Sequence, residues 1–237
     1  RYRGVMRETE IEEVRELPLF EGMAGEQFVG LMKGAFLQRF PARVALIAEH
    51  DRPDFLHVML EGAVELYSEH GARTATLAIR RPFDTFILAA VVRDLPYLAS
   101  GRTIEPSRIL MLPAEAVRAA FDHDGSFARA IVRELSHSFR GVMKELKGQK
   151  LRAGAERLAN WVLVEDAHHG ASGCFKLPHG KRTLAAHLGM TPETLSRTIA
   201  QIADHGASFG HHDVTIVDRD KLTRFAQPSR SLDDVNY

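Results

Sequence analysis

The sequence predicts an α+β protein in which an N-terminal antiparallel β-roll, a long helix and a C-terminal winged helix-turn-helix follow one another. Three observations support this fold class. Apolar residues alternate with a period of two between residues 39 and 112, repeat at heptad spacing between 127 and 149, and form two short helical stripes around Gly189. A run of strands followed by a run of helices is typical of α+β proteins.

Composition limits the classes of function. The chain has 237 residues, 45% of them hydrophobic, and a formal net charge of zero, so any DNA site must be a local basic patch. With Cys174 as its single cysteine, the chain cannot form an internal disulfide or hold a cysteine-ligated iron–sulfur cluster. Neither a signal peptide nor an apolar run long enough for a membrane span is present, which predicts a cytoplasmic protein with no membrane contact.

The N-terminal half begins with helical segments and continues with strands. Residues 1–15 are charged with a helical tendency, and apolar residues at helical spacing predict a helix over 24–37. Further on, Leu56, Val58 and Leu60 alternate with other side chains before a turn at Gly62. Short strands with glycine punctuation predict a compact antiparallel β structure, and the apolar run over 83–92 predicts a helix packed on that structure or on the long helix.

The long helix is predicted over 127–149, which has no proline and a strict heptad spacing typical of a two-stranded coiled coil. We expect this heptad face, called the dimer seam here, to bind a second copy of the chain. The dimer seam consists of Val132, Leu135, Phe139, Val142 and Leu146. The alternative is a single amphipathic helix lying on its own domain, and Ile131 widens the apolar stripe in that sense.

The segment after the long helix is predicted to be a joint, because Gly148 and Gly154 each weaken a helix by about 1 kcal/mol relative to alanine. A helix is predicted over 155–166. The adjacent pair His168 and His169 cannot both face one metal from a regular helix, so no metal site is expected there. The polar tail after Phe225 is expected to fray.

Two short helices are predicted next. The first covers 182–188 and ends at Gly189, which can adopt the left-handed conformation. The second begins after Thr191, a good N-cap, has Pro192 in its first turn and is stopped by Gly206.

The second of these helices has two different faces. Its apolar face consists of Leu195, Ile199 and Ile202, and its opposite face of Glu193, Ser196, Arg197 and Ala200. A polar face with little bulk suits a helix that enters the major groove of DNA. The alternative is an ordinary amphipathic helix with a solvated face.

A local basic patch supports DNA binding. It consists of Lys176, Lys181, Arg182 and Arg197. The residues expected to contact DNA are Lys181, Arg182, Thr183, Thr191, Pro192, Glu193, Thr194, Ser196 and Arg197.

Motifs of hydrolases, metalloproteases and P-loop proteins are absent from the sequence, so no catalytic residues are assigned and the protein is not expected to be an enzyme.

The sequence resembles the Crp/Fnr superfamily of bacterial transcription regulators. Residues 188–197, LGMTPETLSR, resemble its helix-turn-helix, and 206–222, GASFGHHDVTIVDRDKL, resemble the winged end with its closing Asp-x-x-x-Leu element. Residues 17–20, LPLF, and the turn glycine in 60–62 resemble the jelly-roll sensor domain of cyclic-nucleotide-binding regulators.

The resemblance implies three segments and two macromolecular partners. The segments are a cyclic-nucleotide-binding-like sensor over 14–120, a dimerisation helix and hinge over 121–151, and a winged helix-turn-helix over 152–229. The implied partners are double-stranded DNA, at a palindromic promoter site bound by a homodimer, and RNA polymerase.

The resemblance also implies which bases are read. The base-contacting trio of the family corresponds to Glu193, Ser196 and Arg197, as in Fnr-type members that read TTGAT. Members that read TGTGA usually have Arg where this chain has Pro192. An inverted repeat of TTGAT-like half-sites is therefore expected.

The sensor departs from the pattern of family members that bind a cyclic nucleotide. Those members have a Gly-Glu pair and, about ten residues later, an Arg that clamps the phosphate, whereas this chain has apolar residues over 86–92. Arg93 and Arg102 only flank the segment. Cyclic nucleotide binding is therefore disfavoured, the effector is unassigned, and a haem-based NO or CO sensor is a further alternative. Its conceivable ligands are His50, His57, His70, His123 and His137.

Overall fold

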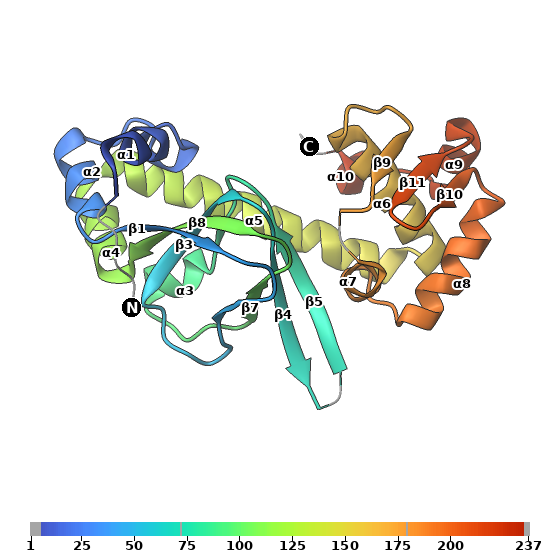
Figure 1. The fold of residues 1–237 in the computed structure, drawn as a ribbon, viewed down its shortest axis with the longest axis horizontal. Helices are drawn as coiled ribbons and strands as arrows, with labels where there is room; N and C mark the ends of the chain where they lie inside the picture. Colours follow the sequence, from blue (N-terminus) through green and yellow to red (C-terminus); the bar gives the residue numbers. More distant parts are fainter. Residues whose placement is uncertain (1–5, 72, 179, 235–237) are drawn as a thin grey trace. The chain divides into compact units, whose positions relative to one another are not determined.

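The computed structural model describes residues 6–71, 73–178 and 180–234 (Figure 1). The chain divides into two compact units, Arg1–Ser138 and Phe139–Tyr237, and the boundary falls inside the long helix α5, Gly125–Leu151. The helix predicted over 127–149 is therefore present. No helix in the described ranges is both long and apolar enough to cross a membrane.

Over its described residues, the first unit combines short helices with eight strands. Its helices before α5 are α1 (Glu8–Arg15), η1 (Pro18–Phe20), α2 (Gly25–Met32), α3 (Leu88–Arg93) and α4 (Ala114–His123). Its strands are β1 (Phe36–Phe40), β2 (Ala45–Ile47), β3 (Phe55–Glu61), β4 (Val64–His70), β5 (Arg73–Arg80), β6 (Thr85–Phe86), β7 (Ser100–Thr103) and β8 (Ser107–Pro113).

These strands form two four-stranded antiparallel sheets, in the orders β1-β8-β3-β6 and β2-β7-β4-β5, which confirms the predicted β structure. Apolar side chains from both sheets, among them Ile47, Val64, Phe86 and Ile109, form one core cluster. Gly62 makes the turn between β3 and β4 with a φ of 87°, and a Cβ there would lie 2.4 Å from the Pro106 carbonyl oxygen. Only glycine fits at this turn.

Strand β3 is buried on both faces, although its sequence alternates. Leu56, Val58 and Leu60 pack in the core formed with the helices of this unit, whereas Met59 belongs to the core between the sheets. His57 is 2% exposed and stacks on Phe86, with ring centroids 4.8 Å apart. An alternating pattern usually marks a half-buried strand, but here the second face is covered as well.

Burial of His57 gives a testable pH dependence of stability. It lowers the pKa of the imidazole to about 4, from the 6.5 expected in the unfolded chain. Because the unfolded state then binds more protons, His57 lowers the free energy of unfolding as the pH falls from 6.5 to about 4. The loss is about 1.4 kcal/mol per pH unit. Above pH 6.5 this residue contributes no pH dependence.

Denaturant titrations from pH 4 to 8 measure this effect. His57→Phe should show a shallower loss of stability below pH 6.5 than the wild type. A His123→Phe variant, altered at an exposed histidine of the same unit, should keep the wild-type slope. Equal slopes in all three proteins would contradict the assignment.

The helices of the first unit depart from the sequence prediction in two places. The helix expected over 24–37 ends at Met32, and β1 begins at Phe36, which pairs with Met111. Phe36 continues the apolar helical spacing, but strand pairing with β8 outweighs this local pattern. In the apolar run over 83–92, Thr85–Phe86 form β6, and the helix α3 begins only at Leu88. Its Leu88 and Val91 are buried, and α3 packs against β3, as predicted, and also against α4.

The second unit contains a three-stranded sheet, in the order β10-β11-β9, and six helical segments including the end of α5. Its further elements are α6 (Gly154–His168), β9 (Cys174–Lys176), α7 (Lys181–His187), α8 (Pro192–Ala203), β10 (Ala207–Phe209), β11 (Asp213–Ile216), α9 (Arg219–Ala226) and α10 (Arg230–Asp233). Leu158, Leu195 and Leu222 lie in its core cluster. The Asp218 carboxylate caps α9 by accepting from the Lys221 N–H at 2.9 Å.

Two expectations for this unit are corrected. The tail after Phe225 is not frayed over the described residues, because α10 is held by an Arg152–Asp233 pair with distances of 2.7 and 2.5 Å. Both side chains of this pair are almost buried. The joint is also narrower than predicted, since α5 continues through Gly148 to Leu151 and α6 starts at Gly154. The i→i−4 hydrogen bonds of α5 outweigh the cost of its internal glycines, Gly141 and Gly148.

Candidate nucleic-acid interface

The helix-turn-helix consists of α7 and α8, joined by a tight turn (Figure 1, orange). Gly189 adopts a φ of 65° in this turn, and the Met190 N–H donates to the Ala185 carbonyl at 2.8 Å. A Cβ at Gly189 would lie 2.7 Å from Oε1 of Gln149 at the end of α5. The turn is therefore packed against the long helix, and glycine is required both for its conformation and for this close approach.

The start of α8 matches the sequence prediction. Thr191 is the N-cap, and its Oγ1 accepts from the Thr194 N–H at 3.2 Å, with Pro192 in the first turn. At its other end, the φ of Gly206 is 94°, which stops the helix. These caps fix where α8 begins and therefore which side chains lie in its first two turns.

The two faces of α8 are separated as the periodicity predicts. Leu195 and Ile202 are buried in the core of the second unit, and Ile199 packs against that core. The exposed face carries Glu193, Ser196, Arg197 and Ala200. The polar residues are thus displayed by a helix whose other side is anchored.

Hydrogen bonds order the exposed polar groups. The Ser196 hydroxyl donates to the Pro192 carbonyl at 3.0 Å, and the Arg197 guanidinium donates to Thr194 Oγ1 at 3.4 Å. The pKa of the Glu193 carboxyl is lowered by a hydrogen bond from its own backbone N–H, then by Thr191 and by the nearby Arg197 charge. Glu193 is therefore an ionised acceptor, and the long Arg197 bond is readily exchanged for a base contact.

The other predicted DNA contacts lie at the start of α7 and of α8. Lys181 and Arg182 are exposed in the first turn of α7, and Thr183 beside them is half-buried. His211 and His212, at the tip of the β10–β11 hairpin, are exposed with ring centroids 4.2 Å apart. Thr198, by contrast, is buried on the inner face and donates to the Thr194 carbonyl at 2.8 Å.

The dimer seam is mostly exposed in the single chain. Val132, Phe139, Val142 and Leu146 are 55%, 66%, 59% and 45% exposed. Leu135 differs, because it is partly buried against the core of the first unit. Four of the five apolar side chains are thus uncovered on α5.

Metal and effector candidates are not assembled into a site. No group of three or more His, Cys, Asp or Glu residues is arranged for a metal among the described residues. His168 and His169 are exposed, and Cys174 is an exposed free thiol. In the first unit, Arg93 is exposed, whereas Arg102 forms an ion pair of 2.7 Å with Glu65, which is 2% exposed.

Family models match both units. Residues 156–225 match the Crp-like helix-turn-helix domain, and residues 37–124 match the cyclic nucleotide-binding domain. A comparison with curated protein sequences gives no significant match.

Solved structures share the fold at low sequence identity. FixK2 from Bradyrhizobium japonicum is 20% identical with a TM-score of 0.73, and the match covers 82% of this chain and 98% of that one. A putative Crp/Fnr-family regulator from Eubacterium rectale is 17% identical with a TM-score of 0.74, covering 89% and 98%. A CooA mutant from Carboxydothermus hydrogenoformans is 19% identical with a TM-score of 0.69, covering 93% and 97%.

The two sheets of the first unit fall almost entirely within the range matched by the cyclic nucleotide-binding model, and the helix-turn-helix with its β10–β11 hairpin falls within the range matched by the Crp-like model. The relative from Eubacterium rectale is described as a transcriptional regulator of the Crp/Fnr family. The chain therefore belongs to the Crp/Fnr superfamily of transcription regulators.

Proposed function

We propose that the protein is a homodimeric transcription regulator that reads an inverted-repeat DNA site with α8 and responds to a signal received by the β-roll. The supporting observation is the exposed face of α8, on which Glu193, Ser196 and Arg197 stand opposite an anchored apolar face. The proposed segments are the sensor over 14–120, the dimerisation helix and hinge over 121–151, and the DNA-binding domain over 152–229. The protein would act in the cytoplasm together with RNA polymerase.

The chemistry of α8 supports a TTGAT-like half-site. Arg197 can donate two hydrogen bonds to O6 and N7 of guanine, and the Glu193 carboxylate can accept from a cytosine amino group. Ser196 can add a weaker contact beside a thymine. Pro192 has no N–H and no polar side chain, so it cannot make the guanine contact of TGTGA readers.

The remaining predicted contacts position the helix without reading sequence. Lys181 and Arg182 carry positive charge beside α8, and Thr183, Thr191 and Thr194 offer hydroxyl groups. We assign these five side chains to the phosphate backbone, where contacts fix orientation but do not distinguish bases.

Contacts inside the first unit support a route for the signal. The Thr85 hydroxyl lies 3.3 Å from the Glu134 carboxylate of α5, and Leu135 packs against the same core as the sensor helices. Burial raises the pKa of Glu134. A signal that favours one arrangement of the roll would thereby bias α5, and through it the spacing of two recognition helices.

Unbiased selection of bound DNA tests the proposed function. Random duplexes selected by the purified protein should yield TTGAT with ATCAA as an inverted repeat, the half-sites about one helical turn apart. A control selection with Glu193→Ala/Arg197→Ala should lose this consensus. Recovery of a non-palindromic site from the wild type would refute the proposal.

The match to a cyclic nucleotide-binding domain makes cyclic AMP the first effector to test, and we expect no binding. Arg102 forms an ion pair with Glu65, whose side chain lies on the face of β4 opposite to the core residues Val64 and Leu66. The segment 86–92 supplies apolar side chains that would leave a phosphate poorly solvated. Calorimetry at micromolar protein should show no heat of binding, and micromolar affinity would overturn this expectation.

Haem is the second effector candidate, and one observation favours it. Of the five histidines considered, His57 is buried while His50, His70, His123 and His137 are exposed. Its Nδ1 has no hydrogen-bond partner. An absorption spectrum of the purified protein decides the question, because haem gives an intense Soret band that should disappear in His57→Phe.

A further inference from the structure

Residues 227–234 form a segment that is attached on both sides of the joint between α5 and α6, all within the second unit. The segment consists of α10 and the connection that leads to α10 from α9, and we call it the C-terminal clamp. It lies outside the dimer seam, the predicted DNA contacts and the β-roll. The clamp is attached to α6, to α5 and to the joint itself.

The attachment to α6 is indirect but short. Helix α9 packs on α6, and the buried Asn160 side chain of α6 donates to the Ala226 carbonyl at the end of α9, at 2.6 Å. Only residues 227–229 separate Ala226 from α10, and Pro228 among them has a fixed φ. A connection of this length spans at most about 14 Å. The position of α10 is therefore limited by the position of α6.

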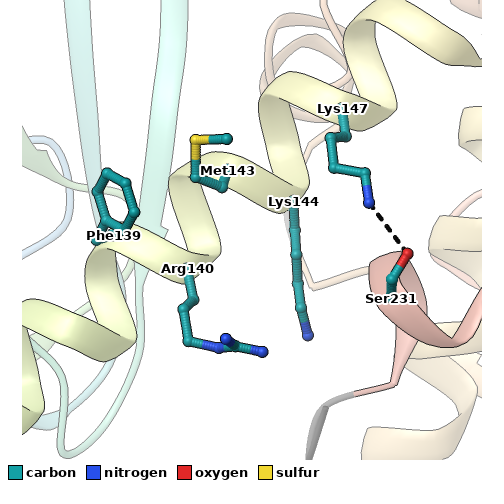
Figure 2. Close-up of a pocket in the computed structure, with 6 residues that line it drawn as sticks. All are labelled: Phe139, Arg140, Met143, Lys144, Lys147 and Ser231. Carbon is teal, nitrogen blue, oxygen red and sulfur yellow. Dashed lines mark hydrogen bonds between the residues drawn. The ribbon is translucent and has the colours of Figure 1, made fainter.

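The attachment to α5 uses two lysines on one side of that helix. Lys144 Nζ donates to the Asp234 carbonyl at 2.6 Å, and Lys147 Nζ donates to the Ser231 hydroxyl at 3.0 Å. Figure 2 shows Lys147 reaching from α5 to Ser231 of α10. These bonds hold α10 against the C-terminal half of α5.

The attachment to the joint is an ion pair with two hydrogen bonds. Arg152 lies between the end of α5 and the start of α6, and its guanidinium donates to both carboxylate oxygens of Asp233, at 2.7 and 2.5 Å. The two side chains are only 12% and 14% exposed. A bidentate pair requires a defined geometry, and loss of one partner leaves a charge with little water around it. The pair therefore holds the joint in one arrangement.

The joint is in turn connected to the helix-turn-helix. The Arg157 guanidinium donates to the Arg152 carbonyl at 2.7 Å and to the Leu188 carbonyl at 3.1 Å. Leu188 lies at the end of α7, directly before the turn at Gly189. A displacement of Arg152 would thus be transmitted to the turn that leads into α8.

We propose that the C-terminal clamp fixes the angle between α5 and the helix-turn-helix and thereby sets the half-site spacing that the dimer accepts. This inference rests on the proposed homodimer that reads an inverted repeat. The dimer seam lies on α5 and the base-contacting face on α8, so the angle between them determines the distance between the two recognition helices. Arg152 and Asp233 act through α8 and are positioning residues.

Hydrogen exchange of the free protein, followed by NMR, tests the clamp without DNA. Asp233→Asn keeps the shape of the side chain but removes its charge. Exchange at the Arg152 amide, which donates to the Gly148 carbonyl, should become at least tenfold faster, whereas exchange in α8 should not change. The matched control Asp234→Asn removes a neighbouring carboxylate whose ion pair, with Arg230, lies within α10. Exchange at the joint that is equal in wild type and Asp233→Asn would overturn the proposal.

DNA duplexes that differ only in half-site spacing test the positioning role. One inserted or deleted base pair shifts a half-site by about 3.4 Å and rotates it by about 35°. With the half-sites recovered by selection, the wild type and Asp234→Asn should bind the preferred spacing at least tenfold more tightly than either neighbour. In Asp233→Asn and in Arg152→Gln this preference should fall to threefold or less. A duplex with a single half-site should bind these two variants and the wild type equally.

A chain that ends at Gln227 provides a second way to remove the clamp, since it leaves Arg152 open to water. It should lose the spacing preference as well. Clamp variants that keep the tenfold preference, or that lose affinity for the single half-site to the same extent, would contradict the positioning role. A wild type that binds no inverted repeat would instead refute the proposed function, and the exchange experiment would still decide whether the clamp holds the joint.

Discussion

Replacing Phe139 and Val142 together with Asp is expected to give monomers that bind DNA at least 100-fold more weakly than the wild type. These side chains are 66% and 59% exposed in the single chain, so the substitutions leave the core intact. Buried in a two-stranded coiled coil, two Asp residues per chain would place unpaired charges in an apolar interface. A monomer reads only one half-site, which removes most of the binding energy of the dimer.

The choice of positions comes from the structure. Leu135 also belongs to the dimer seam, but it packs against the core of the first unit, so Leu135→Asp would also destabilise that unit. Val29→Asp/Leu98→Asp is the matched control, because both side chains are exposed apolar residues elsewhere. Sedimentation should show wild-type and control dimers and monomers of the seam variant. A wild type that is monomeric at micromolar concentration would refute the dimer.

Arg197→Ala is expected to produce the second-largest loss of DNA affinity. A bidentate arginine–guanine contact contributes about 1–3 kcal/mol per half-site. A homodimer makes the contact twice, so the total loss is about 2–6 kcal/mol, or roughly 30-fold to more than 10⁴-fold in Kd. The preference for guanine at that position of the half-site should disappear at the same time. Fluorescence anisotropy with TTGAT duplexes and single-base variants measures both effects.

Arg182→Ala is the matched control for this experiment, since it also removes one guanidinium from the same surface. It should weaken binding to all sequences alike and lower the slope of affinity against salt by about one unit per phosphate contact. Undiminished discrimination of guanine in Arg197→Ala would refute the assignment of the base contact. TGTGA half-sites that survive this substitution would refute the predicted DNA sequence.

Elements specified by local interactions are the ones that the sequence predicts well. The start of α8 follows from the Thr191 cap and Pro192, and its end from Gly206, all within one turn of the residues concerned. The turn at Gly62 follows from the freedom of glycine to adopt a positive φ, and the long helix α5 follows from the heptad periodicity of its apolar residues. The two faces of α8 were therefore predictable residue by residue. The polar face carries the proposed base contacts.

By itself, then, the sequence determined the order of elements, the helix caps and the polar face of α8, because these depend on interactions between near neighbours in the chain. Only the tertiary structure decided that both faces of β3 are buried, that Phe36 joins a strand, and that Leu135 is partly covered. It also decided that the polar tail docks just beyond the end of α5, where Asp233 pairs with Arg152 across 81 residues of chain. An apolar or charged pattern shows which side chains can be buried or paired, but the surfaces that cover them come from segments far away in the sequence.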